Sequence, residues 1–182
     1  MKGFVRSNLL LSLCGLNCGL CPMHLDGHCP GCGGGEGNQS CKIARCSLEH
    51  GNVAYCGDCS CYPCEKYRHF DNFDSFITHR RRNADLERLR EIGEAAYNEE
   101  QRERAEILQF LLANFNDGRR KTFFCLAANL LELSELREIT RRLADDPTIE
   151  QLTPKERTAC VVRLLQKAAE QQAVELKLRK KK

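Results

Sequence analysis

The 182-residue chain lacks the features of membrane proteins and of strongly charged nucleic-acid-binding proteins. No run of about 18 apolar residues occurs, which excludes an ordinary transmembrane helix. The net charge is only +3, which argues against a highly basic nucleic-acid coat and against an acidic tail. With 42% hydrophobic and 29% charged residues, most of the chain can still fold as one or two globular domains.

The N-terminus lacks the apolar core and the small-residue cleavage site of a signal peptide. Its apolar run covers only residues 9–13 and is broken by Ser12, and Leu13 is too large to precede a lipoprotein cysteine at Cys14. We therefore expect a cytoplasmic protein without membrane attachment, in which thiols stay reduced. A dense cysteine pattern then indicates metal binding or redox chemistry rather than disulfides.

Residues 14–64 also have too few apolar side chains to form a core. They hold ten of the thirteen glycines and eleven of the thirteen cysteines. Eleven is an odd number, so disulfides could not pair them all, and bound metal is the element that could stabilise the segment. The candidate metal ligands are Cys14, Cys18, Cys21, Cys29, Cys32, Cys41, Cys46, Cys56, Cys59, Cys61 and Cys64.

The spacing of these cysteines is typical of thiolate metal sites. Four Cys-x2-Cys pairs occur, with first members Cys18, Cys29, Cys56 and Cys61. This spacing lets two thiolates face one ion while the intervening amides turn toward the sulfurs, and two such pairs complete a tetrahedral zinc site. Glycines in the 29–32 and 56–59 pairs allow the positive φ angles of a tight zinc knuckle. We therefore expect two or more zinc ions.

Eleven thiols can be divided in two ways. Two four-thiolate sites leave three cysteines over, whereas one added histidine gives twelve ligands and three sites. His24, His28 and His50 lie inside the cluster and are the candidates for that ligand. Three tyrosines near the last pairs, Tyr55, Tyr62 and Tyr67, are expected to shield metal-bound sulfurs.

An iron–sulfur protein is the alternative to a zinc protein. Cys14-x3-Cys18-x2-Cys21 has the spacing with which radical S-adenosylmethionine enzymes hold a [4Fe-4S] cluster, although the alternating strands and helices of those enzymes do not follow. Proline after Cys21 and after Cys29 is also typical of ferredoxin-like loops. Such a protein would act in electron transfer or as an enzyme subunit. A metal or sulfur carrier is a third hypothesis, and no catalytic residue is predicted.

The second part of the chain is predicted to be helical. We expect a small, irregular, metal-stabilised Cys-rich module, zinc-knuckle-like, over residues 1–69 and an all-α helical bundle over residues 70–182. Apolar spacing predicts one helix through Leu86 and Gly93, a second ending near Phe115, and a buried helix over residues 123–131. Cys125 and Cys160 are expected to be small core residues of this bundle.

Local signals set several further boundaries. Residues 42–48 are predicted to form one or two helical turns, and residues 33–38 a flexible loop. Ser134 is expected to cap one helix, and Thr153 with Glu156 forms a capping-box pair for the last. The alternation of Val174, Leu176 and Leu178 predicts a short strand, and residues 179–182 a frayed, solvated tail.

The motif Cys14-Gly15-Leu16-Asn17-Cys18-Gly19-Leu20-Cys21-Pro22 resembles the opening of a cysteine-rich prokaryotic family, the domain of unknown function 3795 family. The later cysteine pairs continue the resemblance, which covers about residues 10–70. Residues 117–127 resemble a motif in the helical part of longer members. The resemblance implies a zinc-binding protein with no established activity.

Together these patterns predict a non-catalytic metal-binding protein. Its zinc sites would be mainly structural and would support a binding or regulatory surface. The sequence leaves the partner unknown, with another protein as one hypothesis; the near-neutral charge disfavours nucleic acid, and no segment favours a membrane.

Overall fold

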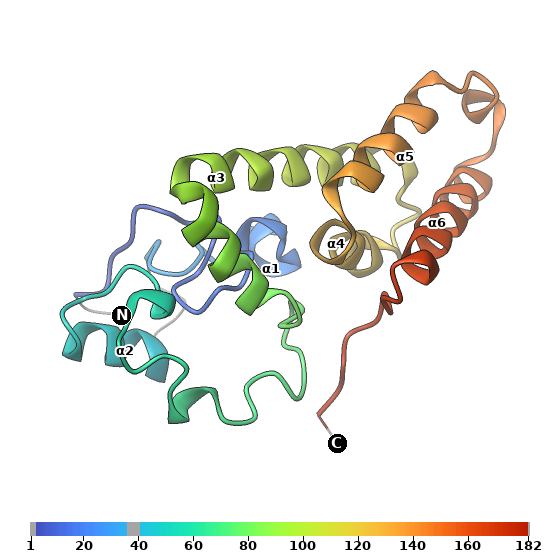
Figure 1. Cartoon of the computed structure of the whole chain (residues 1–182). Coiled ribbons are helices and arrows are strands. Elements are labelled where there is room, and N and C mark those ends of the chain that lie inside the picture. Colours follow the sequence, from blue (N-terminus) through green and yellow to red (C-terminus); the bar gives the residue numbers. More distant parts are fainter. Residues whose placement is uncertain (1–2, 36–40, 182) are drawn as a thin grey trace. The chain divides into compact units, whose positions relative to one another are not determined.

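The computed structural model describes residues 3–35 and 41–181, and within those residues it contains helices and 3-10 turns but no strand. Contacts divide the chain into two compact units (Figure 1). Unit 1 comprises Met1–Gln101 and Leu178–Lys182, and unit 2 comprises Arg102–Lys177. In the described part of the chain, no helix has the length and apolar character that crossing a membrane requires.

Unit 1 is built from short elements and the first part of one long helix. These elements are η1 (Cys18–Leu20), α1 (Pro22–Leu25), α2 (Lys42–Glu49), η2 (Cys56–Asp58), η3 (Glu65–Tyr67) and the start of α3 (Arg82–Phe115). Helix α2 confirms the helical turns predicted for residues 42–48. Residues 36–38 of the predicted flexible loop lie outside the described residues.

Unit 1 extends to Gln101, beyond the boundary expected at residue 69, because α3 supplies part of its core. One apolar cluster joins Leu11 and Tyr55 to three residues of α3, namely Leu86, Leu89 and Tyr97. A second cluster contains Phe4, Leu13, Ile43, Ala44 and Tyr67. The core of the cysteine-rich segment therefore includes apolar side chains from before residue 14 and after residue 64.

Helix α3 is interrupted at Gly93, which was predicted to lie within a regular helix. Gly93 has φ 81° and ψ 159°, far from helical values. No atom of the described residues lies within 4 Å of the position that a Cβ atom would take at Gly93, so the backbone conformation alone favours glycine here. The helix then continues past Gln101 into unit 2.

Unit 2 is helical, as predicted. It consists of the end of α3, α4 (Lys121–Leu130), α5 (Leu133–Asp145), η4 (Ile149–Gln151) and α6 (Pro154–Gln171). In α4 every side chain from Phe124 to Leu130 is buried, which confirms the predicted buried helix. Buried Arg104 joins α3 to the end of α4, because its Nη1 donates to the carbonyl oxygens of Ala128 and Leu131, at 2.8 Å each.

The two predicted helix caps have different outcomes. Thr153 forms the predicted capping box with Glu156 at the start of α6. The prediction for Ser134 was wrong, because α5 begins earlier, at Leu133, with Glu132 at the N-cap position. Ser134 thus lies inside the first turn, where its hydroxyl cannot act as the N-cap group. Helices α5 and α6 contact each other, and α6 returns alongside α5 (Figure 1).

The C-terminal segment differs from its prediction. Residues 174–178 form no strand, since no second strand among the described residues offers them a ladder of hydrogen bonds. The expectation of a frayed tail was wrong for Arg179. Its backbone N–H donates to Asp74 Oδ2 at 2.8 Å, and its Nη2 donates to Asp74 Oδ1 at 2.8 Å. The tail is therefore attached to unit 1.

Candidate metal centre

All eleven candidate ligands lie in unit 1 as free thiols. Ten of them are half-buried, and Cys61 is exposed. Of the two cysteines in unit 2, Cys125 is buried in α4, as expected for a small core residue, and Cys160 is half-buried in α6. The free thiols of unit 1 are therefore the groups from which a metal centre could be built.

Four thiols, here called the first thiol set, are electrostatic neighbours: Cys14, Cys18, Cys32 and Cys41. They come from distant parts of the chain. Cys18 begins η1 and Cys41 is the N-cap of α2, while Cys14 and Cys32 lie in loops. Three of them, Cys14, Cys32 and Cys41, contact the apolar cluster around Leu13.

Burial destabilises the thiolate forms of the first thiol set when no cation is present. It raises the pKa of Cys14 and of Cys18 to about 12 each, and repulsion from Cys32 adds to both shifts. Polar groups oppose this effect. Ser12 Oγ lies 3.2 Å from Cys14 Sγ, and hydrogen bonds from Ser12 and from the backbone of Leu16 lower the pKa of Cys14. Donors are thus already directed at the sulfur for a thiolate form.

A second thiol set surrounds a small cavity of ≈ 30 Å³. Its members are Cys46, Cys56, Cys59 and Cys64. Cys46 comes from α2, Cys56 and Cys59 bound η2, and Cys64 is the N-cap of η3. His50 also lines the cavity, and its Nδ1 lies 3.5 Å from Cys46 Sγ. The structure therefore brings one of the three candidate histidines to this set.

The Tyr67 hydroxyl is buried beside the second thiol set. Within the described residues no group completes a hydrogen bond of normal geometry with it. The thiol that it faces is Cys56: burial raises the pKa of Cys56 to about 11, and the Tyr67 hydroxyl lowers it. Burial also raises the pKa of Tyr67. A neutral thiol is a weak acceptor, whereas a thiolate at Cys56 would satisfy this hydroxyl.

The remaining candidates are less enclosed. Burial raises the pKa of Cys21, hydrogen bonds from the backbone of Met23 and His24 lower it, and Cys29 is its electrostatic neighbour. The Nδ1 atom of half-buried His24 lies 2.9 Å from the carbonyl oxygen of Cys29. His28 is exposed, like Cys61. These residues form a thiol pair with a nearby imidazole rather than a third four-ligand set.

The thiols of each set are neighbours without being preformed ligand shells. In residues 3–35 and 41–181 no three Cys, His, Asp or Glu side chains converge closely enough to hold a metal ion. The chemistry of the donors nonetheless fits a soft divalent cation, because each set offers four sulfurs and hydrogen-bond donors aimed at them. The sequence indicates one of the two hydrogen-bond donors, Tyr67, but not the other, Ser12. Tyr67 follows a cysteine pair, whereas nothing in the sequence marks Ser12.

Two of the three tyrosines expected to shield the sulfurs, Tyr62 and Tyr67, line the cavity of the second thiol set. Tyr55 belongs to another network, because its hydroxyl donates to Glu94 and accepts from Asn8.

Comparisons with protein-family models, with curated proteins and with solved structures found no match. Any function must therefore be argued from the chain's own residues.

Proposed function

We propose that this chain is a thiolate metal-binding protein that acts in the reducing cytoplasm. Each of the two thiol sets would hold one zinc ion, and the ions would stabilise unit 1 as a binding or regulatory surface. Residues 14–22 resemble the opening motif of the domain of unknown function 3795 family, and we propose membership on that motif alone, since no family model matches the chain. The ions would have structural roles, because four thiolates leave no open position for a substrate.

The observation that carries the proposal is the second thiol set around its cavity. Four sulfurs from three elements line a space of ≈ 30 Å³, and among the described residues the buried Tyr67 hydroxyl there has no hydrogen-bond partner. Zinc takes four sulfur ligands at about 2.3 Å, so the sulfurs would move inward to coordinate one ion. The Cys56 thiolate would then accept a hydrogen bond from Tyr67, which would remove an unsatisfied buried group.

Energetics supports the same assignment. Burial raises the pKa of Cys14, Cys18 and Cys56, so these thiols stay neutral at pH 7 without a cation. A bound Zn²⁺ would favour the thiolates and displace their protons. Unit 1 has small apolar clusters and many irregular loops, so the metal-binding free energy would contribute to its folding.

The test is metal analysis of the full chain purified anaerobically with reductant. We expect about two zinc ions per chain and a colourless protein. Cys56→Ser should remove about one ion, because it deletes a ligand of the second thiol set. Cys61→Ser is the matched control, since Cys61 lies in the same segment but is exposed, and its zinc content should equal that of the wild type. Metal-free protein, or equal losses in both variants, would contradict the proposal.

An iron–sulfur cluster is the alternative occupant, since four cysteine thiolates also bind iron–sulfur clusters. The proline residues after Cys21 and after Cys29 favour it. Brown protein, absorbance near about 400 nm and iron with inorganic sulfide would establish this occupant in place of zinc. The same Cys56→Ser and Cys61→Ser pair would then show whether the second thiol set holds the cluster.

A further inference from the structure

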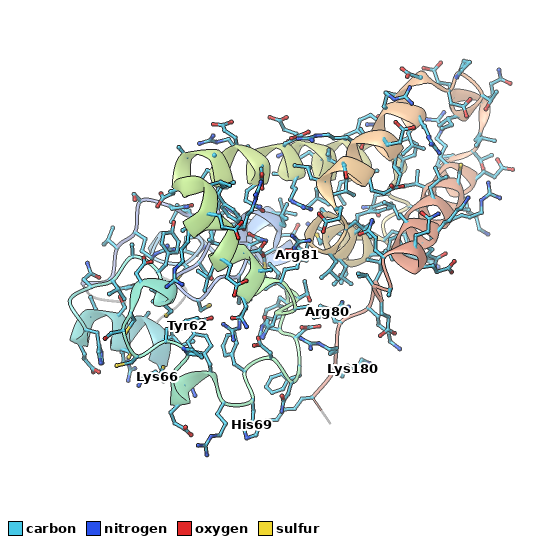
Figure 2. The ribbon with its side chains drawn as sticks, viewed as in Figure 1. Tyr62, Lys66, His69, Arg80, Arg81 and Lys180 are labelled. Atoms are coloured by element: carbon cyan, nitrogen blue, oxygen red, sulfur yellow. The ribbon has the colours of Figure 1, made fainter. Side chains whose placement is uncertain are left out.

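Basic side chains from two distant parts of the sequence meet on unit 1. One group runs from η3 to the first turn of α3, and the other belongs to the C-terminal segment. Figure 2 shows the labelled members Lys66, His69, Arg80, Arg81 and Lys180 around the loop that joins η3 to α3. We call residues 65–85 together with 179–181 the basic surface.

Three contacts fix the C-terminal segment to the loop. Asp74 and Arg179 form an ion pair of 2.8 Å, and the Asp74 backbone N–H donates to the carbonyl oxygen of Arg179 at 2.8 Å. The Lys181 ammonium lies 5.7 Å from the centre of the Phe73 ring. The lysines of the tail are thereby held beside the loop, where they add to its charge.

The charge of the basic surface is concentrated, although that of the whole chain is nearly balanced. Its residues include eight lysines and arginines and four acids, a net charge of +4 against +3 for the entire chain. Three acids are occupied within the surface, because Glu65 pairs with Arg68, Asp71 with Arg82, and Asp74 with Arg179. These pairs are 2.7, 2.6 and 2.8 Å long. The fourth, Asp85, is buried and lies 3.6 Å from Arg81. The exposed Lys180 and Lys181 thus face solvent in a surface whose acids are already engaged.

Aromatic rings are interleaved with these cations. Phe76 is 65% exposed, which is unusual for a phenylalanine, and Phe73 is half-buried. Tyr62 is also half-buried, and its hydroxyl accepts from Arg82 Nη1 at 2.8 Å. An exposed ring and solvent-facing cations on one surface are the elements with which proteins bind single strands, because bases stack on rings while phosphates contact the cations.

We propose that the basic surface binds single-stranded nucleic acid without strong sequence preference. Lys66, Lys180 and Lys181 would contact backbone phosphates, and a base would stack on Phe76. A membrane fits less well, because insertion needs several exposed apolar side chains and Phe76 is the one large exposed hydrophobic residue that the described part of this surface presents. An acidic peptide would use the cations but would leave the exposed ring without a role.

The test is fluorescence anisotropy of a labelled 20-nucleotide RNA of mixed sequence with the full, metal-loaded chain at several salt concentrations. We expect saturable binding that weakens as salt rises. The double variant Lys180→Ala/Lys181→Ala should weaken binding about tenfold at low salt. It should also lower the slope of log K against log salt by roughly 1 to 1.5. Phe76→Ala should weaken binding about fivefold and leave the slope unchanged, because it removes stacking and no charge.

Matched controls separate local from general effects. Lys155→Ala/Lys167→Ala removes the same charge from α6 in unit 2, and Val5→Ala truncates an exposed apolar residue outside the basic surface. Both should bind RNA like the wild type. Equal losses in the control and test variants would overturn the proposal. So would binding to phosphatidylserine vesicles or a poly-glutamate peptide without binding to RNA. The zinc content of every variant, measured in parallel, keeps this test separate from that of the metal proposal.

Discussion

Asp74 and Arg179 are joined by hydrogen bonds although 105 residues of chain separate them. The Asp74 side chain is completely buried, and it also accepts the backbone N–H of His79 at 2.9 Å. Burial alone would raise the pKa of Asp74, but hydrogen bonds from Arg179 and from the backbone outweigh it and lower the pKa to about 2. The carboxylate is therefore more stable in the folded than in the unfolded chain.

This contact predicts a pH-dependent contribution to stability. The folded pKa of about 2 lies below the usual 3.8, so the contribution is complete above about pH 4 and is lost as the pH falls toward 2. Arg179 is one third exposed, so solvent screening limits the effect, and Asp74→Asn should lower the unfolding free energy by about 1–2 kcal/mol at pH 7. Urea unfolding of both proteins at pH 7 and pH 2 measures it, with Lys180→Ala as the neutral control. An equal difference at both pH values would contradict the assignment.

Tyr67→Phe tests the hydrogen bond that the buried hydroxyl would make to a metal-bound Cys56. Removing a donor to a ligand sulfur should lower the zinc affinity of the second thiol set by about tenfold without removing the ion. Competition with a chromophoric chelator measures the change. Tyr62→Phe is the control, because the Tyr62 hydroxyl bonds to Asn83 and Arg82 rather than to sulfur. If both variants bound zinc as tightly as the wild type, the proposed role of Tyr67 would be wrong.

Metal removal should affect the two units differently. The chain has no tryptophan, and its four tyrosines, Tyr55, Tyr62, Tyr67 and Tyr97, all belong to unit 1. Tyrosine fluorescence therefore reports on unit 1, whereas most of the far-ultraviolet helical signal comes from α3 to α6. A strong chelator with reductant should change the fluorescence and leave most of the helical signal, because unit 2 contains no candidate ligand. Simultaneous loss of both signals would contradict independent stabilisation of the units.

Gly93→Ala should destabilise unit 1 by about 1–2 kcal/mol. The cost comes from forcing a side chain into φ 81°, since open space surrounds the new Cβ atom. Urea unfolding followed by tyrosine fluorescence measures this cost. Ala95→Ser, an exposed change in the same helix, should shift the midpoint much less. A stabilised Gly93→Ala protein would instead indicate that α3 can run straight through this position.

The sequence predicts the helices of unit 2 well, because their apolar stripes have helical spacing and the Thr153 capping box is a local signal. It locates the thiols but cannot divide them into sets, since Cys14 and Cys41 meet through tertiary folding. Gly93 resembles any helical glycine in the sequence, and its break depends on the backbone path. The C-terminal boundary of the first stretch of unit 1 cannot be predicted from the sequence either. Leu86 and Leu89 have the same helical spacing whether they pack in the core of unit 1 or of unit 2.

The attachment of the C-terminal segment also bears on the order in which the chain is made. Unit 1 consists of two stretches, and the whole of unit 2 is synthesised between them. During translation Asp74 leaves the ribosome long before Arg179, so the carboxylate lacks its cation until unit 2 has also been synthesised. Domains usually fold as they emerge, from the N-terminus onward. Unit 1 cannot be completed until Arg179 has been added, so a ribosome stalled before that residue would expose an unfinished unit 1 to proteases.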